Sequence, residues 1–351
     1  MLNVLTEQLR RRENLTEEQV RDAIAQLTAK TVAVEAKADF LTALAQKGEA
    51  TEEIANFARH LRELSIQPPL DAETRAREIL DVCGTGGDKL NTFNISTTVA
   101  LVCASGGVAV AKHGNRAITS QSGSADVLET LGIRIDLTPE EAARSLKEHH
   151  FAFFFAQKYH PAFKNIGPAR KLCAERGQRT IFNFLGPLMN PVRPSAQLIG
   201  VPRPQLCEPM ARVLQSLGIR RGMVVTGEVP VPGQPSPAHL DEFSTLGETT
   251  VAEFYHDRGF TTSSLSPENY PLQPATLADL AGGDKEANAA IVRRVLAGDE
   301  RGPKRDAVLL NAGAALFVAG KVKSITEGWE LAANLIDGGR ASAQLKALSG
   351  R

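Results

Sequence analysis

The stretch Ile79-Leu-Asp-Val-Cys-Gly-Thr-Gly-Gly-Asp88 decides the fold class of this chain. It begins as a short, mostly apolar run of the kind that forms a buried strand, and glycines follow at once. Working outward, Val108–Ala111 is a second such run, which ends in Lys112-His-Gly-Asn-Arg116. Other predicted strands lie at 151–155, 198–201 and 223–226, and stretches of helical pattern lie at 96–105, 124–131, 139–149, 204–217 and 309–319. Strands that alternate with helices predict an α/β domain with a central, largely parallel sheet.

The residues before this stretch have a helical pattern instead. Thr16-Glu-Glu-Gln19 has the spacing of a capping box, and Thr51 opens another helix. Gln67-Pro-Pro-Leu70 then interrupts the pattern and marks a linker. We therefore expect a small helical domain over residues 1–69 and a larger α/β domain over residues 76–351.

The composition excludes several classes of protein. Lys+Arg and Asp+Glu both number 40, and this balance argues against general nucleic-acid binding, which requires a basic excess. The four cysteines form no C-x-x-C pair, so a zinc site or a disulfide framework is not expected. No apolar run is long enough to span a bilayer, and the charged first residues do not have the pattern of a signal peptide. These features predict a soluble cytoplasmic protein that contacts neither membrane nor nucleic acid.

Two predicted strands end in segments suited to phosphate. Gly84-Thr-Gly-Gly-Asp88 allows backbone N–H groups to approach an anion, and Asn94-Ile-Ser-Thr97 leads into a helix whose first N–H groups favour negative charge. Lys112–Arg116 adds two cations, and hydroxyls follow at 119–124. Each segment alone is equally consistent with a tight turn or a solvated loop. Because ligands bind at the carboxyl ends of parallel strands, the pair together favours a site for a pyrophosphate and a sugar.

Two further candidates are less specific. Asp241-Glu242 can supply oxygen ligands to Mg²⁺, although an acidic pair that merely begins a helix is common. Arg170, at a predicted helix start, can bind a carboxylate in a bidentate manner, although a surface arginine fits the sequence as well. The proline-containing segment Glu228–His239 is expected to be a loop.

These motifs, taken together, resemble a known family. GTGGD, NTFNIST, KHGNR, SGSADVLE, TIFNFLGPL, DE and RDAVLLNAGAAL occur in the order found in anthranilate phosphoribosyltransferases, within the nucleoside phosphorylase/phosphoribosyltransferase class. The resemblance covers nearly the whole chain. It implies an enzyme of tryptophan biosynthesis that transfers the phosphoribosyl group of phosphoribosyl pyrophosphate (PRPP) to the amino group of anthranilate. It also implies a homodimer formed through the helical domain, which helices near 165–180 would complete.

The resemblance assigns roles residue by residue. PRPP binding is implied for Gly84, Gly87, Asp88, Thr92, Asn94, Ile95, Ser96, Thr97, Lys112, His113, Gly114, Asn115, Arg116, Ala117, Ile118, Thr119, Ser120 and Ser124. Anthranilate binding is implied for Gly84, Asn115 and Arg170, and Mg²⁺ binding, with two ions held together with PRPP, for Ser96, Asp241 and Glu242. The aryl amine is unprotonated at neutral pH, so no residue is assigned as a general base.

The chain departs from the family pattern in three places. Thr31–Ala36 replaces a turn of small residues, extra residues lie between Arg170 and Thr180, and the loop before Asp241 is long and rich in proline. Three alternatives stay open at this point: a nucleoside phosphorylase-like enzyme of the same fold, a nucleic-acid-binding relative, and a non-catalytic scaffold. The phosphorylase would need no Mg²⁺, the nucleic-acid-binding relative should show a basic surface, and the scaffold would give no reason for two phosphate-suited loops.

Overall fold

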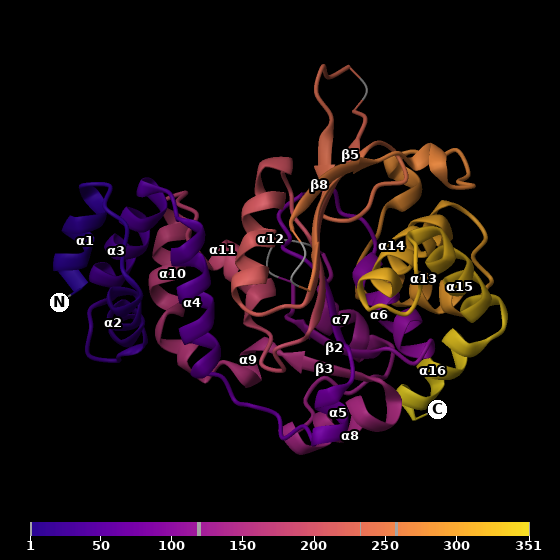
Figure 1. Cartoon of the computed structure of the whole chain (residues 1–351), viewed down its shortest axis with the longest axis horizontal. Helices are drawn as coiled ribbons and strands as arrows, with labels where there is room; N and C mark the ends of the chain where they lie inside the picture. Colours follow the sequence, from indigo (N-terminus) through magenta and orange to yellow (C-terminus); the bar gives the residue numbers. More distant parts are fainter. Residues whose placement is uncertain (1, 118–120, 232, 257–258, 351) are drawn as a thin grey trace.

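The computed structural model describes residues 2–117, 121–231, 233–256 and 259–350, in which a small helical domain lies beside a larger α/β domain (Figure 1). The capping box predicted at Thr16 is confirmed, because its side chain accepts a hydrogen bond from the N–H of Gln19 at 3.3 Å. The linker predicted at 67–70 separates the first helices from the sheet. The helices of the small domain are α1 (Leu2–Arg10), α2 (Glu17–Thr28), α3 (Val34–Lys47), α4 (Thr51–Glu63) and, from much later in the chain, α10 (Gly167–Glu175).

The return of the chain to the helical domain has a clear physical basis. α10 packs against α3, and its Ala169 and Cys173 are buried in the same apolar cluster as Leu41 of α3. Lys37 of α3 is also buried, and its Nζ donates to the carbonyl of Asn165 at 2.9 Å. Apolar burial and this charged hydrogen bond thus hold the two distant segments together.

The α/β domain is built on one sheet whose strand order is β3-β2-β1-β4-β5-β7-β8, with β6 paired to β5. β3, β2, β1, β4 and β5 are parallel, and the pairs β5–β6, β5–β7 and β7–β8 are antiparallel. The mostly parallel sheet confirms the predicted α/β class. Its strands are β1 (Ile79–Gly84), β2 (Ala109–Gly114), β3 (Phe151–Phe155), β4 (Ala196–Gly200), β5 (Arg221–Val229), β6 (Ala238–Leu240), β7 (Thr249–Tyr255) and β8 (Thr261–Leu265).

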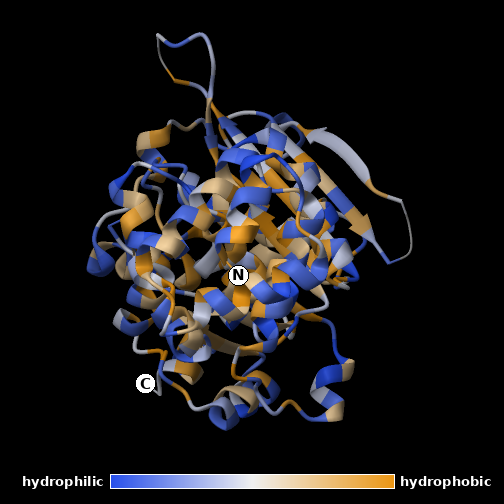
Figure 2. Cartoon of the chain, turned by 90° about the vertical axis from the view of Figure 1, so that its left-hand side faces the viewer, coloured by the Kyte–Doolittle hydropathy of each residue, from blue (hydrophilic) through white to orange (hydrophobic). Residues whose placement is uncertain are grey.

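Helices cover both faces of the sheet, and apolar residues lie mainly between the layers (Figure 2). One face packs against α6 (Ile95–Ser105) and α14 (Pro303–Val318), which are surrounded by α7 (Ser124–Thr130), α13 (Lys285–Ala297), α15 (Ile325–Asp337) and α16 (Arg340–Ser349). The other face packs against α8 (Pro139–His149) and α12 (Cys207–Ser216), and α12 also contacts α4 of the helical domain. The short helices are α5 (Ala72–Ala76), α9 (Ala156–Tyr159) and α11 (Phe182–Leu185).

The structure differs from the sequence expectations in two segments. The expected loop at 228–239 is wrong at both ends, because β5 continues to Val229 and β6 begins at Ala238, so that a hairpin projects from the sheet (Figure 1). β2 also extends beyond Ala111 to Gly114, because Lys112 and His113 pair with β3 and are buried.

Among the described residues, no helix is both long enough and apolar enough to cross a membrane.

Candidate active site

The glycine-rich loop after β1 contacts Asp241 directly. The N–H of Gly86 donates to Oδ2 of Asp241 at 2.6 Å, and the positive φ of Gly86 (74°) is a conformation that glycine adopts at little cost. A Cβ atom at position 84 would lie 2.3 Å from the same carboxylate oxygen. Gly200, at the end of β4, allows an equally close approach, because a Cβ there would lie 1.5 Å from the carbonyl oxygen of Asp241. Glycine at these positions therefore brings the carboxylate against the end of the sheet.

The second carboxylate, Glu242, contacts the start of α6. Its Oε1 accepts a hydrogen bond from the backbone N–H of Ser96 at 3.1 Å, where the positive end of the helix dipole favours an anion. Lys112 lies on the other side of Ser96, with Nζ 3.4 Å from the Ser96 hydroxyl and 2.6 Å from the carbonyl oxygen of Val82. The ends of β1 and β2, the start of α6 and the acidic pair thus meet at one place.

Burial disfavours the ionised forms of the two carboxyl groups in this cluster. Burial raises the pKa of Glu242 to about 8, although the charge of Lys112 and the Ser96 N–H oppose the shift. Burial, together with the neighbouring charges of Asp88 and Glu242, also raises the pKa of Asp241 well above its usual value. A cation held between these carboxylates would stabilise their ionised forms.

The donor set at this cluster fits Mg²⁺, which prefers oxygen ligands. Asp241, Glu242 and the Ser96 hydroxyl supply such oxygens. Two more polar oxygens at the start of α6, Oδ1 of Asn94 and Oγ1 of Thr97, are buried and have no hydrogen-bond partner among the described residues. In the described part of the chain, no group of three or more His, Cys, Asp or Glu side chains is arranged to hold a metal ion by itself. The remaining ligands would therefore have to come from a bound phosphate or from water.

The segment that follows β2 packs closely on the start of α7. The carbonyl of Asn115 accepts hydrogen bonds from the N–H of Ala125 at 3.2 Å and from the hydroxyl of Ser124 at 3.4 Å. A Cβ at Gly114 would lie 2.3 Å from Oγ of Ser124, so the Ser124 side chain would have to shift to accommodate another residue there. Asn94 reaches the same region, because its Nδ2 donates to the carbonyl of Ser122 at 3.4 Å. These contacts bring Lys112–Ala117, Ser124 and the start of α6 together.

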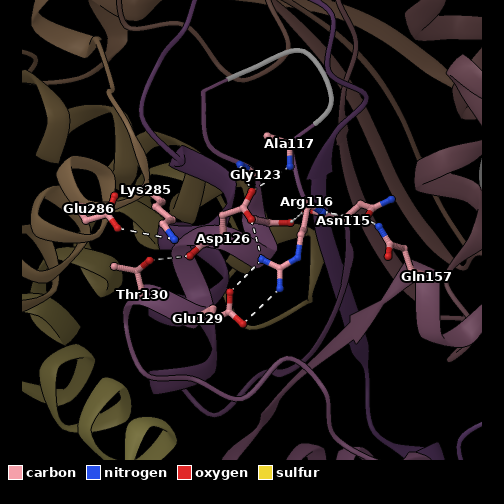
Figure 3. Close-up of polar contacts among 11 residues, drawn as sticks. Asn115, Arg116, Ala117, Gly123, Asp126, Glu129, Thr130, Gln157, Lys285 and Glu286 are labelled. Carbon is pink, nitrogen blue, oxygen red and sulfur yellow. Dashed lines mark hydrogen bonds and ion pairs between the residues drawn. The ribbon is translucent and has the colours of Figure 1, made fainter.

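The guanidinium of Arg116 forms ion pairs within the protein. Its Nη1 lies 2.9 Å from Oδ1 of Asp126 and 2.9 Å from Oε2 of Glu129 (Figure 3). The guanidinium also lies over the ring of Phe155. Two carboxylates thus compensate the arginine. Lys112 is the cation that the structure places beside the acidic pair.

Arg170 lies near the start of α10, the helix through which the chain returns to the helical domain. Its guanidinium lies over the ring of Phe182, 5.0 Å from the centroid, and burial lowers its pKa. No carboxylate among the described residues forms an ion pair with it. A series of ring contacts runs from Phe182 through Phe163 and His160 to His113 of β2, where the two imidazole Nε2 atoms lie 3.1 Å apart. Arg170 and the end of β2 are therefore connected through packed rings.

The remaining predicted residues are placed as follows. Thr92 forms an isolated bridge with Ala281, Ile95 is buried at the first turn of α6, and Asp88 lies close enough to raise the pKa of Asp241. Ile118, Thr119 and Ser120 lie outside the described residues. The sequence reasoning missed the contacts of Asp126, Gly200 and Asn311, although Asp126 and Asn311 belong to the quoted SGSADVLE and RDAVLLNAGAAL motifs.

Two family models match the two structural parts of the chain. Residues 4–65 match the helical bundle domain of the glycosyl transferase family, and residues 76–342 match the a/b domain of the same family. The fold and the site thus define a two-domain glycosyl transferase.

Individual relatives specify the family further. An anthranilate phosphoribosyltransferase from Lacticaseibacillus casei (strain BL23) is 45% identical over 348 residues, which cover 99% of this chain and 96% of the relative. The crystal structure of anthranilate phosphoribosyltransferase from Thermus thermophilus has a TM-score of 0.87 and 41% identity, and the match covers 99% of this chain and 98% of that one. The enzyme from Saccharomyces cerevisiae in complex with PRPP and Mg has a TM-score of 0.85 and 26% identity, over 99% and 97% of the two chains. The chain belongs to the anthranilate phosphoribosyltransferase family.

Proposed function

We propose that this protein transfers the 5-phosphoribosyl group of PRPP to the amino group of anthranilate, which yields N-(5-phosphoribosyl)anthranilate and pyrophosphate in tryptophan biosynthesis. The observation that carries the proposal is the meeting of the GTGGD loop, the start of α6 and the pair Asp241–Glu242 through hydrogen bonds of 2.6 and 3.1 Å. This arrangement combines phosphate-suited N–H groups with ligands for a cation. Family membership identifies the substrates.

PRPP would occupy the region between the ends of β1 and β2. Its phosphates and ribose would be contacted by Gly84, Gly87, Asp88, Thr92, Asn94, Ile95, Ser96 and Thr97, together with Lys112–Ser120 and Ser124. Lys112 is buried, and its Nζ lies at hydrogen-bond distance from Ser96. A buried cation acts strongly on a neighbouring anion because little water screens it. The side chain of Lys112 would therefore help to orient the pyrophosphate.

Mg²⁺, as two ions bound together with PRPP, would be held by Asp241, Glu242 and the Ser96 hydroxyl. Bound there, the metal would supply positive charge that stabilises the departing pyrophosphate. The raised pKa values of both carboxyls favour this assignment, since burial of an ionised pair without a counter-charge is costly.

Anthranilate would lie near Gly84 and Asn115, with Arg170 directed at its carboxylate. A planar guanidinium matches a carboxylate with two parallel hydrogen bonds. The amine then attacks C1 of the ribose while the bond from C1 to the pyrophosphate oxygen breaks and its electron pair leaves with pyrophosphate. The amine loses one proton. We assign no general base, because correct placement of the two substrates can supply ~7–11 kcal/mol of the barrier reduction.

We further propose that the protein is a cytoplasmic homodimer that associates through the helical domain. That domain would consist of residues 1–69, joined by the helices near 165–180. Residues 76–351 would form the catalytic domain. Val4, Leu64 and Ile66 are exposed large apolar residues of this region, which supports an interface there. Light scattering at micromolar concentration should give twice the chain mass. A monomer would exclude this assembly.

Pyrophosphate release tests the function itself. The purified protein should release pyrophosphate from PRPP only when anthranilate and Mg²⁺ are both present. Phosphorolysis of nucleosides without Mg²⁺ would instead identify a phosphorylase of the same fold.

A further inference from the structure

We propose that Asp126 is a positioning residue that sets the shape of the half of the site that follows β2. This inference rests on the proposed function, because it assumes that the segment after β2 contacts PRPP. Asp126 belongs to α7 and has no role in the assignments above.

One carboxylate joins three separate donors. Oδ2 of Asp126 accepts hydrogen bonds from the N–H of Ala117 at 3.0 Å and from the N–H of Gly123 at 3.0 Å. Oδ1 accepts from Nη1 of Arg116 at 2.9 Å (Figure 3). The side chain therefore links the chain that leaves β2 to the chain that enters α7.

The contact with Gly123 alone would be ordinary helix capping, in which a carboxylate at the third position accepts the N–H of the capping residue. Glu141 of α8 shows that ordinary case. It accepts the N–H of Thr138 at 2.8 Å and pairs with Arg134 at 3.0 Å. Asp126 differs from Glu141 because it also accepts the N–H of Ala117, and this hydrogen bond fixes the segment after β2.

The close packing of the two segments leaves little room for another arrangement. A Cβ at Gly123 would lie 2.4 Å from the nitrogen of Ala117 and 2.8 Å from the carbonyl oxygen of Asn115. Gly123 has a φ of −90°, which any residue adopts, so the need for glycine comes from this contact. Asp126 thus holds the backbone of Asn115–Ala117 against the start of α7.

Arg116 takes part through the same contacts. Its Nη1 also lies 2.9 Å from Oε2 of Glu129, and its Nη2 donates to Oε1 of Glu129 at 3.3 Å, so its charge is balanced within the protein. The guanidinium would then contribute to PRPP binding indirectly, through the position of the backbone that carries it.

The test compares Asp126→Asn with the matched control Glu141→Gln, because both changes keep the side-chain volume and remove one charge from a capping carboxylate that pairs with arginine. For Asp126→Asn we expect the KM for PRPP to rise about tenfold, as loss of charged hydrogen bonds implies, while the KM for anthranilate stays within about twofold. Glu141→Gln should leave both KM values unchanged, although both variants should lose thermal stability to a similar extent.

Gly123→Ala provides a second, independent test that leaves Asp126 in place. It should also raise the KM for PRPP selectively, because the added methyl group separates the two segments. If either variant folds and keeps the wild-type KM for PRPP, the positioning role is refuted. Calorimetry on the wild-type protein separates this outcome from failure of the proposed function, since a wild type that does not bind PRPP with Mg²⁺ would refute the function instead.

Discussion

Glu242 accepts a hydrogen bond from the backbone N–H of Ser96 at 3.1 Å, and this contact joins the acidic pair to the start of the helix that follows the glycine-rich loop. The two residues are far apart in sequence, because Ser96 lies at the start of α6 and Glu242 follows β6. Their contact explains why a carboxylate pair, a helix N-terminus and a buried lysine lie together.

The double variant Asp241→Asn with Glu242→Gln should lose transferase activity by about 100-fold or more, because the neutral amides no longer attract the metal that stabilises the leaving group. Its melting temperature without Mg²⁺ should stay equal to that of the wild type or rise, since burial raises the pKa of both carboxyls. Activity across a Mg²⁺ titration and thermal unfolding give the two readouts. Wild-type activity with an unchanged Mg²⁺ dependence would show that the pair is structural.

Asn311 should be required to hold the acidic pair in place. Its Oδ1 accepts the N–H of Phe243 at 2.9 Å, and its Nδ2 donates to the carbonyl of Phe243 at 3.1 Å, so this fully buried amide fixes the backbone next to Glu242. Asn311→Ala leaves both backbone groups unpaired, which should cost about 2–4 kcal/mol of the free energy of unfolding and raise the Mg²⁺ concentration needed for half-maximal activity.

The matched control is Leu316→Ala, a buried change in the same helix. It should destabilise the protein by a similar amount, about 2–5 kcal/mol, and leave the Mg²⁺ dependence unchanged. Equal Mg²⁺ dependence in Asn311→Ala and the wild type would refute the role of Asn311.

Arg170→Ala should raise the KM for anthranilate about tenfold or more and change the KM for PRPP much less, because a bidentate contact with the substrate carboxylate is lost. Arg170→Lys should restore only part of the affinity, since an ammonium cannot form that contact. Arg176→Ala, at the end of the same helix, removes a surface arginine that pairs with Asp39 at 3.2 Å and should change neither value. Equal effects of Arg170→Ala on both substrates would exclude Arg170 from the anthranilate site.

Because His113 and His160 are buried, we expect the free energy of unfolding to be sensitive to acid. Burial lowers the pKa of His160 to about 4 and, with the charge of His160, that of His113 to about 3. The unfolded chain therefore binds more protons below pH 6.5, and the free energy of unfolding should decrease as pH falls from about 6.5 towards 4. The shift of His160 corresponds to at most about 3 kcal/mol.

Chemical unfolding of the wild type and His160→Gln at several pH values isolates this contribution. The free energy difference between the two proteins should shrink as pH decreases through this range. Burial raises the pKa of Asp81 to about 6 and acts in the opposite direction, but it is common to both proteins. A difference that stays constant from pH 7 to pH 4.5 would contradict the assignment to His160.

The sequence predicts those helices and strands whose formation depends on neighbouring residues in the chain. The capping box at Thr16, the strand Phe151–Phe155 and the helix at 139–149 follow from periodicity and end residues, and all three are present. β7 and β8 were not predicted. β8 carries exposed threonines and serines, so it lacks the apolar alternation that marks a strand, and its pairing with β7 decides its structure.

The sequence predicts which types of residue form the candidate site, but it does not predict which of them contact one another. Glycines and cations at successive strand ends indicate a phosphate site from the sequence alone. The compensation of Arg116 by Asp126 and Glu129 depends on a tertiary contact, which no spacing rule shows. The same holds for Gly200, whose close approach to Asp241 involves a residue from another part of the sheet.

Loss of anthranilate fluorescence on addition of PRPP, with and without Mg²⁺, reports the proposed transfer directly. We expect a steady decrease in the presence of Mg²⁺, with one pyrophosphate released for each anthranilate consumed, and almost none without the metal or in the Asp241→Asn, Glu242→Gln variant. Unchanged fluorescence with the folded wild-type protein, PRPP and Mg²⁺ together would contradict it.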